Sequence, residues 1–366
     1  MLATARFTRE FLFPRRAAVV VEEMTYRRGD ESLPASLYRP RHVGRPLPGW
    51  MTLHGLTHHG RDHESLKRLA RALAAAGSAV LVPDIPEWRA LEVAPGAAVA
   101  TIKAAVLELD ALGLTEPGRI GAIGFSFGAT QALIAATDPA LEGHLAGVAA
   151  WGGYADIRTV SRFMFLGEHE LDGTSYTASP DPYGRWILAG SYLGLLDDFN
   201  GEPGLAPRFL TLAREAARRR IMSWDPRLDP LKARLREDLS AGDREVFDLI
   251  APATDVTLSA SQRTHLQALV DRMLEAAIRR EPLLDAAPYL GRIRVPIFLA
   301  HGRGDRLIPW TEMVRLRRAL PADRIASSGV TSLFAHSGGE RRIPSPGTAI
   351  EAARFLRLMR RMLGLI

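Results

Sequence analysis

Cysteine is absent from this chain of 366 residues, so disulfide bonds and thiolate metal sites are excluded. Lysine is nearly absent, because the 47 basic residues include only Lys67, Lys103 and Lys232 as lysines. The remaining arginines reflect genome composition and are scattered among 41 acids, so nucleic-acid binding is not expected. The lack of cysteine also fits a reducing compartment, and we expect a cytoplasmic protein.

Long apolar runs are missing as well. No stretch of about 18 consecutive apolar residues occurs, so stable membrane insertion is not expected. A twin arginine stands at Arg15 and Arg16, but the apolar run after it, 17–21, is too short for a secretory signal. We interpret that run as the start of a strand.

Short apolar runs alternate with helical patterns over most of the chain. The expected strands cover 17–24, 33–40, 49–55, 78–86, 119–124, 145–153, 295–305 and 329–339. The expected helices cover 64–77, 97–113, 127–139, 311–320 and 347–363. A turn is expected at Glu116, Pro117 and Gly118. Apolar strands that alternate with helices predict an α/β fold, with a mostly parallel sheet and helices on both of its faces.

The alternation stops between residues 155 and 293, where the sequence indicates helices and loops. The clearest helix covers 259–280, with Leu266, Leu269 and Met273 on one face. We therefore expect 1–154 and 294–366 to form one α/β core. The segment 155–293 is expected to be a helical cap, inserted after the strand that follows the helix of 127–139.

A polar serine stands between two glycines in "GFSFG", 124–128, where an expected strand gives way to a helix. Glycines at this spacing let the backbone turn sharply without side-chain collisions. The Ser126 hydroxyl would then project above the sheet edge, beside the Phe127 amide at the helix start. This pattern predicts a nucleophile elbow; the alternative is an exposed serine in a glycine-rich turn.

A serine nucleophile needs a base and an orienting carboxylate, and two later strands supply candidates. Asp305 follows the strand of "IFLAHGRGD", and His336 follows that of "SLFAHSGG". Each has an alternative: Asp305 caps the next turn, His336 is a surface histidine, or Asp156 is the acid instead. His301 is interpreted as a packing or supporting residue.

The order Ser126, Asp305, His336 resembles that of the α/β-hydrolases, and the resemblance covers nearly the whole chain outside 155–293. Within that superfamily the chain is similar to dienelactone-hydrolase-like and prolyl-oligopeptidase-like members, without the propeller domain of the latter. The resemblance implies a serine esterase that forms an acyl-enzyme and needs no cofactor or metal. It also makes the Leu56 amide, after "HG" at 54–55, the second oxyanion donor beside that of Phe127.

The same three side chains would serve a peptidase, a thioesterase or a lactonase, and the chemistry alone does not choose among them. A serine nucleophile argues against a dehalogenase, which would use an aspartate. A non-catalytic binding protein on the same scaffold is the alternative from another class. The expected partner is a small-molecule ester, and a homodimer is compatible with the sequence.

Several residues invite a role in a substrate pocket. His58 and His59, with nearby His63, match no zinc template well, so contact with a loop or substrate is favoured over a metal site. Tyr183 and Trp186 are expected to line an acyl pocket, unless they form the core of the cap instead. The basic amphipathic C-terminal helix is expected to pack on the sheet rather than to contact a membrane.

Overall fold

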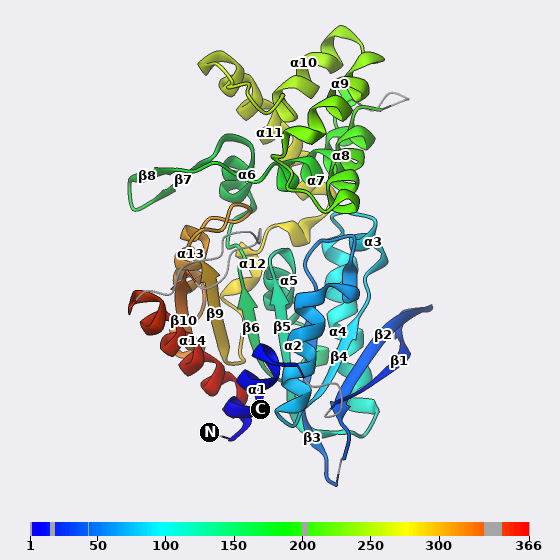
Figure 1. Cartoon of the computed structure of the whole chain (residues 1–366), viewed down its shortest axis with the longest axis vertical. Coiled ribbons are helices and arrows are strands. Elements are labelled where there is room, and N and C mark those ends of the chain that lie inside the picture. The colour runs from blue at the N-terminus through cyan, green and yellow to red at the C-terminus, as the bar shows by residue number, and fades with distance from the viewer. Residues whose placement is uncertain (1, 15–18, 43, 200–203, 333–345, 366) are drawn as a thin grey trace.

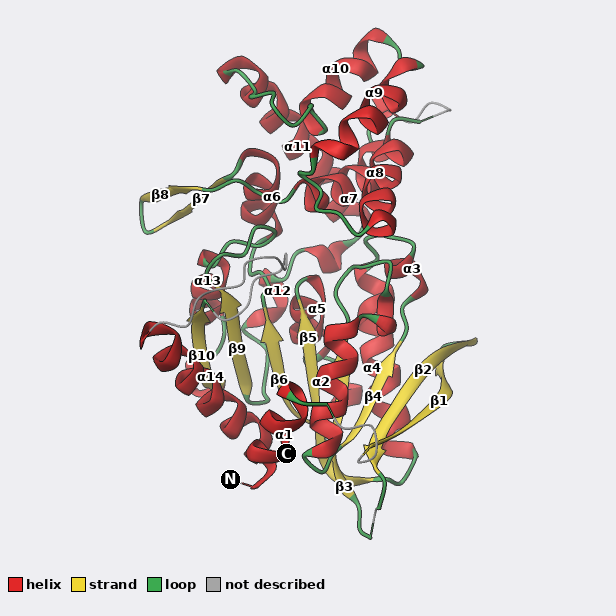
Figure 2. Ribbon diagram, in the orientation of Figure 1, coloured by secondary structure: helices red, strands yellow, loops and turns green. Residues whose placement is uncertain are grey.

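The computed structural model describes residues 2–14, 19–42, 44–199, 204–332 and 346–365. Its centre is an eight-stranded sheet with the order β1-β2-β4-β3-β5-β6-β9-β10 (Figures 1 and 2). The strands are β1 Val19–Arg28, β2 Glu31–Pro40, β3 Leu47–Leu53, β4 Ala79–Pro83, β5 Thr115–Phe125, β6 Leu145–Trp151, β9 Ile297–Gly302 and β10 Ile325–Thr331. Among the described strands of this sheet, only the β1–β2 and β2–β4 pairs are antiparallel, so the predicted mostly parallel sheet is confirmed.

Helices cover both faces of the sheet because strand side chains alternate between them. Trp50 and Val80 contribute to one apolar core, and Met51 and Leu81 contribute to the other. The first core is closed by α1 Leu2–Leu12, α2 Glu64–Ala75 and α14 Pro346–Leu365. The second is closed by α4 Pro95–Ala111, α5 Phe127–Ala135 and α13 Thr311–Ala319.

One predicted turn differs from the structure, and one helix was not predicted. The predicted turn at 116–118 is wrong, because these residues lie within β5, although Gly118 has a φ of +68°. Helix α1 was not predicted; its signal is the four-residue spacing of Phe7 and Phe11, whose rings stack at 5.7 Å.

The register of the parallel strands brings their carboxyl ends to one edge. Leu53 of β3 is paired with Gly124 of β5, and Phe125 of β5 with Trp151 of β6. Trp151 is in turn paired with Ala300 of β9. The loops that follow these strands therefore meet at this edge, where ligands bind in open α/β sheets.

The segment between β6 and β9 lies beyond the same edge (Figure 1). It contains α6 Ile157–Leu166, α7 Pro182–Tyr192, α8 Ala206–Arg219, α9 Asp229–Glu237, α10 Ala241–Ile250, α11 Ala260–Arg280 and α12 Ala287–Leu290. A short hairpin of β7 Glu168–Leu171 and β8 Thr174–Thr177 was not predicted. The helices share an apolar interior in which Phe209 and Phe247 stack at 5.4 Å. That this segment acts as a cap stays a prediction.

Candidate active site

Ser126 lies between the end of β5 and the start of α5 in an unusual backbone conformation. Its φ is 56° and its ψ is −129°, a combination that side-chain-bearing residues rarely adopt. The Ser126 amide donates to the Trp151 carbonyl at 2.9 Å, which ties the turn to β6. Strain of this kind, held in place by neighbouring structure, is typical of functional residues.

The two glycines around Ser126 are required by close backbone contacts. A Cβ on Gly124 would lie 2.2 Å from the Gly128 carbonyl oxygen, which no side chain could relieve. A Cβ on Gly128 would lie 3.0 Å from the carbonyl oxygen of His54. The "GFSFG" pattern therefore exists because α5 begins directly against the ends of β5 and β3.

The loop after β3 lies beside the serine. A Cβ on Gly55 would be 3.5 Å from the Ser126 Cβ, and both Leu56 and Phe127 line the same pocket as Ser126. The two amides predicted as oxyanion donors thus belong to residues that line the pocket with the serine. Their role as oxyanion donors stays a prediction.

His54 fixes the orientation of the peptide that carries the Leu56 amide. Its Nδ1 lies 2.7 Å from the Gly55 carbonyl oxygen, which can only accept, so Nδ1 donates. Burial lowers the pKa of the His54 imidazole, which keeps the ring neutral. Because the C=O and N–H of one trans peptide point in opposite directions, this bond directs the Leu56 N–H away from His54.

Asp305 is buried just after β9, with a side chain that is 2% exposed. Its Oδ1 accepts from the amides of Leu307 and Ile308 at 2.8 and 2.9 Å. Its Oδ2 lies 3.6 Å from Nε2 of His301, which donates to the Ile308 carbonyl at 2.9 Å. The carboxylate does cap the following turn, as the alternative expected, and these bonds also fix its orientation at the sheet edge.

Asp156 occupies a helix start instead. Its Oδ1 accepts from the Arg158 amide at 2.9 Å, which makes it the N-cap of α6. Its own amide, together with that of Ala155, donates to the buried carboxylate of Glu312. These contacts assign Asp156 to the anchoring of α6.

His336 lies outside the described residues, so its predicted role as base stays a prediction. The structure describes the chain leading to it. β10 is parallel to β9 and ends with Thr331 paired with Gly302. The chain thus leaves β10 at the edge that carries Ser126 and Asp305, and the Ser332 amide donates to Glu351 at 2.7 Å.

A small apolar pocket opens beside Ser126, with a volume of about 60 Å³. Its walls come from the sheet edge, from α6 and α7, and from two connections that the sequence did not indicate. The lining residues are Leu56, Val93, Ser126, Phe127, Tyr154, Ile157, Val160, Met164, Tyr183, Gly184, Ile187, Leu188, Leu307 and Ile308. Apolar spacing in α7 could have suggested Ile187 and Leu188, but only the fold brings Val93 and Leu307 here.

The aromatic residues of α7 divide between two roles. Tyr183 lines the pocket beside Ser126, and burial raises the pKa of its phenol, which stays neutral. That this pocket receives an acyl group stays a prediction. Trp186 is fully buried and is not among the lining residues; Lys232 Nζ lies 6.0 Å from its ring centre. For Trp186 the alternative holds, since it packs within the inserted segment.

The histidines after β3 lie away from the described pocket lining. His58 and His59 are both exposed, with ring centres 6.1 Å apart. Across the described part of the chain, no three His, Cys, Asp or Glu side chains are grouped so that they could hold a metal ion. Neither histidine is among the residues that line the Ser126 pocket.

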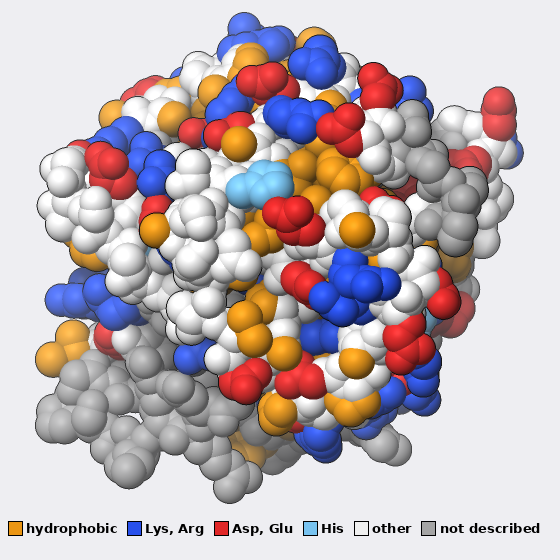
Figure 3. Space-filling view, turned by 90° about the horizontal axis from the view of Figure 1, so that it is seen from above, with side chains coloured by type: hydrophobic (Ala, Val, Ile, Leu, Met, Phe, Trp, Pro, Cys, Tyr) orange, Lys and Arg blue, Asp and Glu red, His pale blue; other side chains and the backbone are white. Residues whose placement is uncertain are grey.

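A larger hollow of about 430 Å³ lies within the inserted segment, where charged side chains of both signs surround an apolar area on the face seen from above (Figure 3). It is lined by Ser240, His265 and Glu245 among others. Ser240 is the N-cap of α10, because its Oγ accepts from the Asp243 amide at 3.1 Å. This serine has an ordinary capping role and no strained turn, so we do not assign the active site here.

Comparisons with known proteins support the fold through structure alone. No protein-family model matches the sequence, and no curated protein matches it. Brefeldin A esterase, a bacterial homologue of human hormone sensitive lipase, has a solved structure that aligns with 99% of this chain and 84% of its own. The TM-score is 0.52 at 17% sequence identity. The chain has the α/β-hydrolase fold. This α/β-hydrolase fold confirms the prediction drawn from the elbow and the alternating strands and helices.

Other solved structures are similar at a lower level. A putative dienelactone hydrolase from Klebsiella pneumoniae aligns with 94% of this chain and 99% of its own, with a TM-score of 0.47 at 13% identity. An acylaminoacyl peptidase from Pyrococcus horikoshii aligns with 98% of this chain, with a TM-score of 0.49 at 13% identity. This chain spans only 42% of that peptidase. No helix in the described residues is long and apolar enough to cross a membrane.

Proposed function

We propose that this protein is a serine hydrolase that cleaves carboxylic esters with short apolar acyl groups. The observation that carries the proposal is the strained backbone of Ser126, held between α5 and β6 at the mouth of an apolar pocket. A serine in an ordinary turn would need neither this φ nor the contacts that exclude a side chain at Gly124.

In the proposed reaction, the Ser126 Oγ attacks the acyl carbon while His336 takes its proton. His336 then gives the proton to the leaving alcohol, which departs and leaves an acyl-enzyme. Water, deprotonated by the same histidine, attacks the ester carbon. The bond from that carbon to the Ser126 Oγ then breaks, His336 returns the proton to the Oγ, and the acid is released. Asp305 holds the imidazole in the required tautomer, with its own orientation set by the Leu307 and Ile308 amides.

The amides of Leu56 and Phe127 are proposed to bind the oxyanion of the tetrahedral intermediate. Each such donor is worth about 3 kcal/mol in the transition state. Phe127 is the first residue of α5, so the positive end of that helix adds to the stabilisation of negative charge. None of these steps requires a cofactor.

The pocket supports an apolar acyl group over a charged one. Among its described lining residues none is an Asp, Glu, Lys or Arg. Its volume of about 60 Å³ is far below the roughly 300–1,000 Å³ of pockets for drug-sized ligands, which favours a short acyl chain. We therefore propose that α6 and α7, as part of a cap of residues 155–293, set substrate size without catalysing.

Labelling with a fluorophosphonate tests the proposal, because only an activated serine reacts with it. We expect a single adduct on Ser126, absent in Ser126→Ala and retained in Ser240→Ala. A protein without labelling at Ser126 would be the non-catalytic binding protein considered above. A panel of acyl esters, thioesters, lactones and aminoacyl amides then separates esterase from thioesterase, lactonase and peptidase.

A further inference from the structure

Two helices that pack on one face of the sheet carry a group of exposed arginines. Helices α1 and α14 lie near both chain termini (Figure 1) and pack side by side on the sheet face that α2 also covers. Their exposed arginines, called the arginine face below, are Arg6, Arg9, Arg354, Arg357, Arg360 and Arg361.

Few acids accompany the arginine face on its own two helices. The only acids of α1 and α14 are Glu10, which is 2% exposed, and Glu351, which accepts the Ser332 amide. Within the described residues, no ion pair involves any of the six arginines, and Arg361 donates only to the Ala326 carbonyl at 3.3 Å. Some arginines elsewhere lie beside acids, as in the pair of Arg227 with Asp225.

Exposed apolar side chains accompany these arginines. Five of the nine large hydrophobic residues that the described structure exposes lie on or directly after these two helices: Leu2, Leu12, Phe13, Ile350 and Leu356. Phe13 is the most exposed of all, at 70%. The inner side of α14, by contrast, is already packed against the protein, because Met359 and Met362 are fully buried.

We propose that the arginine face is a docking surface for an anionic phospholipid bilayer. Lipid phosphates would neutralise the unpaired arginines, and each basic residue near such a surface strengthens binding about five-fold. Leu12 and Phe13 would enter the boundary between headgroups and acyl chains, where an exposed aromatic ring is stabilised. A nucleic-acid backbone would satisfy the charge but leave these apolar side chains in water.

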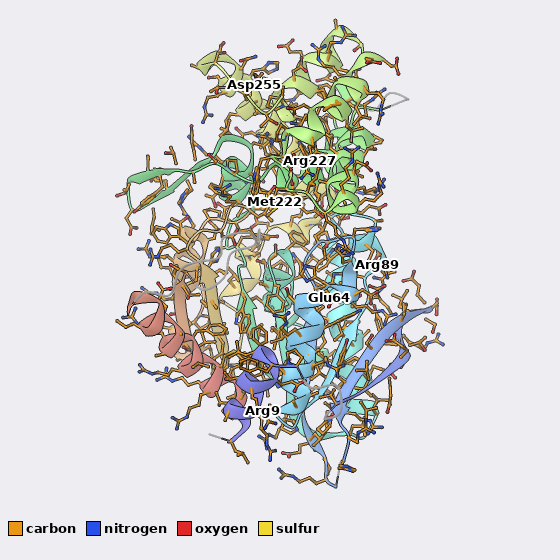
Figure 4. All side chains as sticks on the ribbon, viewed as in Figure 1. Arg9, Glu64, Arg89, Met222, Arg227 and Asp255 are labelled. Carbon is orange, nitrogen blue, oxygen red and sulfur yellow. The ribbon has the colours of Figure 1, made fainter. Side chains whose placement is uncertain are left out.

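The orientation that follows keeps the candidate site accessible. Figure 4 places Arg9 at the lower end of the molecule, Glu64 farther up on α2, and Asp255 at the upper end in the inserted segment. Docking through α1 and the C-terminal part of α14 would therefore leave the inserted segment, which lies beyond the sheet edge that carries Ser126, away from the lipid. The inference goes beyond the hydrolase function and does not depend on it.

Co-sedimentation of the full chain with lipid vesicles tests the proposal. We expect binding to vesicles of phosphatidylcholine and phosphatidylglycerol in equal parts, at least ten-fold stronger than to phosphatidylcholine alone. Because the attraction is electrostatic, this binding should weaken as salt is added. Equal binding to both vesicles, or none to either, would overturn the proposal.

Variants separate the arginine face from the net charge of the chain. Arg357→Gln with Arg360→Gln should weaken binding to the anionic vesicles about thirty-fold. The matched control, Arg234→Gln with Arg279→Gln, removes the same charge from exposed, unpaired positions on α9 and α11 and should leave binding unchanged. Equal losses in the two double variants would show a non-specific charge effect and sink the proposal.

A third variant tests the apolar part. Phe13→Ser keeps all charges and should weaken vesicle binding while leaving any binding to a DNA duplex unaltered. Tight DNA binding that Arg357→Gln with Arg360→Gln abolishes, with vesicle binding unaffected, would instead assign the face to nucleic acid. Unchanged melting temperatures and unchanged hydrolysis of a soluble ester confirm that each variant is folded.

Discussion

At the scale of single residues, Ser126 shows how strain and chemistry coincide. Its φ of 56° costs a residue with a side chain about 1–3 kcal/mol, which the surrounding structure offsets. The Trp151 carbonyl accepts its amide, and the Ser126 carbonyl accepts the Ala129 amide at 2.9 Å. The strained residue also lines the apolar pocket, so the two properties can be tested together.

Two substitutions at Ser126 should separate strain from chemistry. Both Ser126→Ala and Ser126→Gly remove the nucleophile and should lower esterase turnover on the order of a million-fold. Only Ser126→Gly relieves the strained φ, so it should raise the free energy of unfolding by about 1 kcal/mol. Urea denaturation of the three proteins measures this. Either variant retaining a tenth of the activity would exclude Ser126 as nucleophile.

Two aspartates follow neighbouring strands, and the proposed reaction gives only one of them a chemical role. Asp305→Asn keeps an oxygen for the Leu307 and Ile308 amides but favours the wrong histidine tautomer, so kcat should fall about 10⁴-fold. Asp156→Asn is the matched control, because Asn caps a helix as well as Asp does. The test is to measure kcat of both variants by steady-state kinetics. A larger loss of kcat in Asp156→Asn than in Asp305→Asn would give the chemical role to Asp156 instead.

The buried His54 should make stability depend on pH. Its pKa is lowered in the native state, so below pH 6.5 the unfolded chain takes up a proton that the native protein does not. Its contribution therefore lowers the free energy of unfolding as pH falls, by up to about 1.4 kcal/mol per pH unit. His54→Asn removes this titration and should flatten the profile between pH 7.5 and 5.5.

The same residue offers a control for the oxyanion geometry. Asn at position 54 retains an N–H that can donate to the Gly55 carbonyl, whereas Leu does not. His54→Leu should therefore lower kcat further than His54→Asn does. Equal kcat values in the two variants would mean that this hydrogen bond does not orient the Leu56 amide.

At the scale of elements, one face of α7 lines the pocket and another is buried within the inserted segment. Tyr183, Ile187 and Leu188 face the pocket, whereas Trp186 is buried within the inserted segment. Asp181 fixes where the helix begins, since its side chain accepts the Tyr183 amide at 3.0 Å. Gly184 allows close packing, because a Cβ there would lie 2.8 Å from the Met164 sulfur.

Substitutions on these two faces should have different consequences. Tyr183→Ala enlarges the pocket and should shift the preferred acyl chain to longer esters, at about 0.8 kcal/mol per added methylene that becomes buried. Trp186→Ala should leave the preference unchanged but lower the free energy of unfolding by about 3–5 kcal/mol. A chain-length series and urea denaturation check both. Identical chain-length profiles for wild type and Tyr183→Ala would remove α7 from the pocket.

At the scale of the whole molecule, one buried carboxylate ties the core to the inserted segment. Glu312 of α13 is fully buried and accepts from the Ala155 amide at 2.9 Å and from the Thr159 hydroxyl at 2.7 Å. Burial raises the pKa of this carboxyl, and the same hydrogen bonds partly oppose that rise. The position at which the chain leaves β6 for α6 is thus set by a helix distant in sequence.

Removing this carboxylate should weaken the junction. Glu312→Ala leaves the amides of Ala155 and Asp156 without their acceptor, so the free energy of unfolding should fall by about 3 kcal/mol. Glu64→Ala, at an exposed position on α2, is the control and should change it by less than about 0.5 kcal/mol. Similar stability in both variants would show that Glu312 does not hold the junction.

The sequence by itself determined what depends on short-range patterns. Apolar periodicity located the parallel strands and the helix of 259–280, whose capping box at Ser259 is present in the structure. The "GFSFG" pattern was sufficient to place Ser126 on a strained turn, because Gly124 is required by contacts within the strand, turn and helix themselves. In these cases the contacts that determine the structure join residues close together in the chain, so the local sequence is sufficient to predict them.

Only the tertiary structure decided features that depend on distant partners. Residues 116–118 have the sequence of a turn, yet they lie within β5. The pairing with β3 resumes on both sides of them, at Leu47 with Thr115 and at Gly49 with Ile120, and the register shifts between the two pairs. Helical spacing shows that α7 is partly buried but not which of its sides lies near Ser126. The sequence therefore could not tell that Tyr183 lines the pocket and that Trp186 does not. Which arginines stay unpaired is likewise set by which helices become neighbours. Such contacts join residues far apart in the chain, and no local pattern records them.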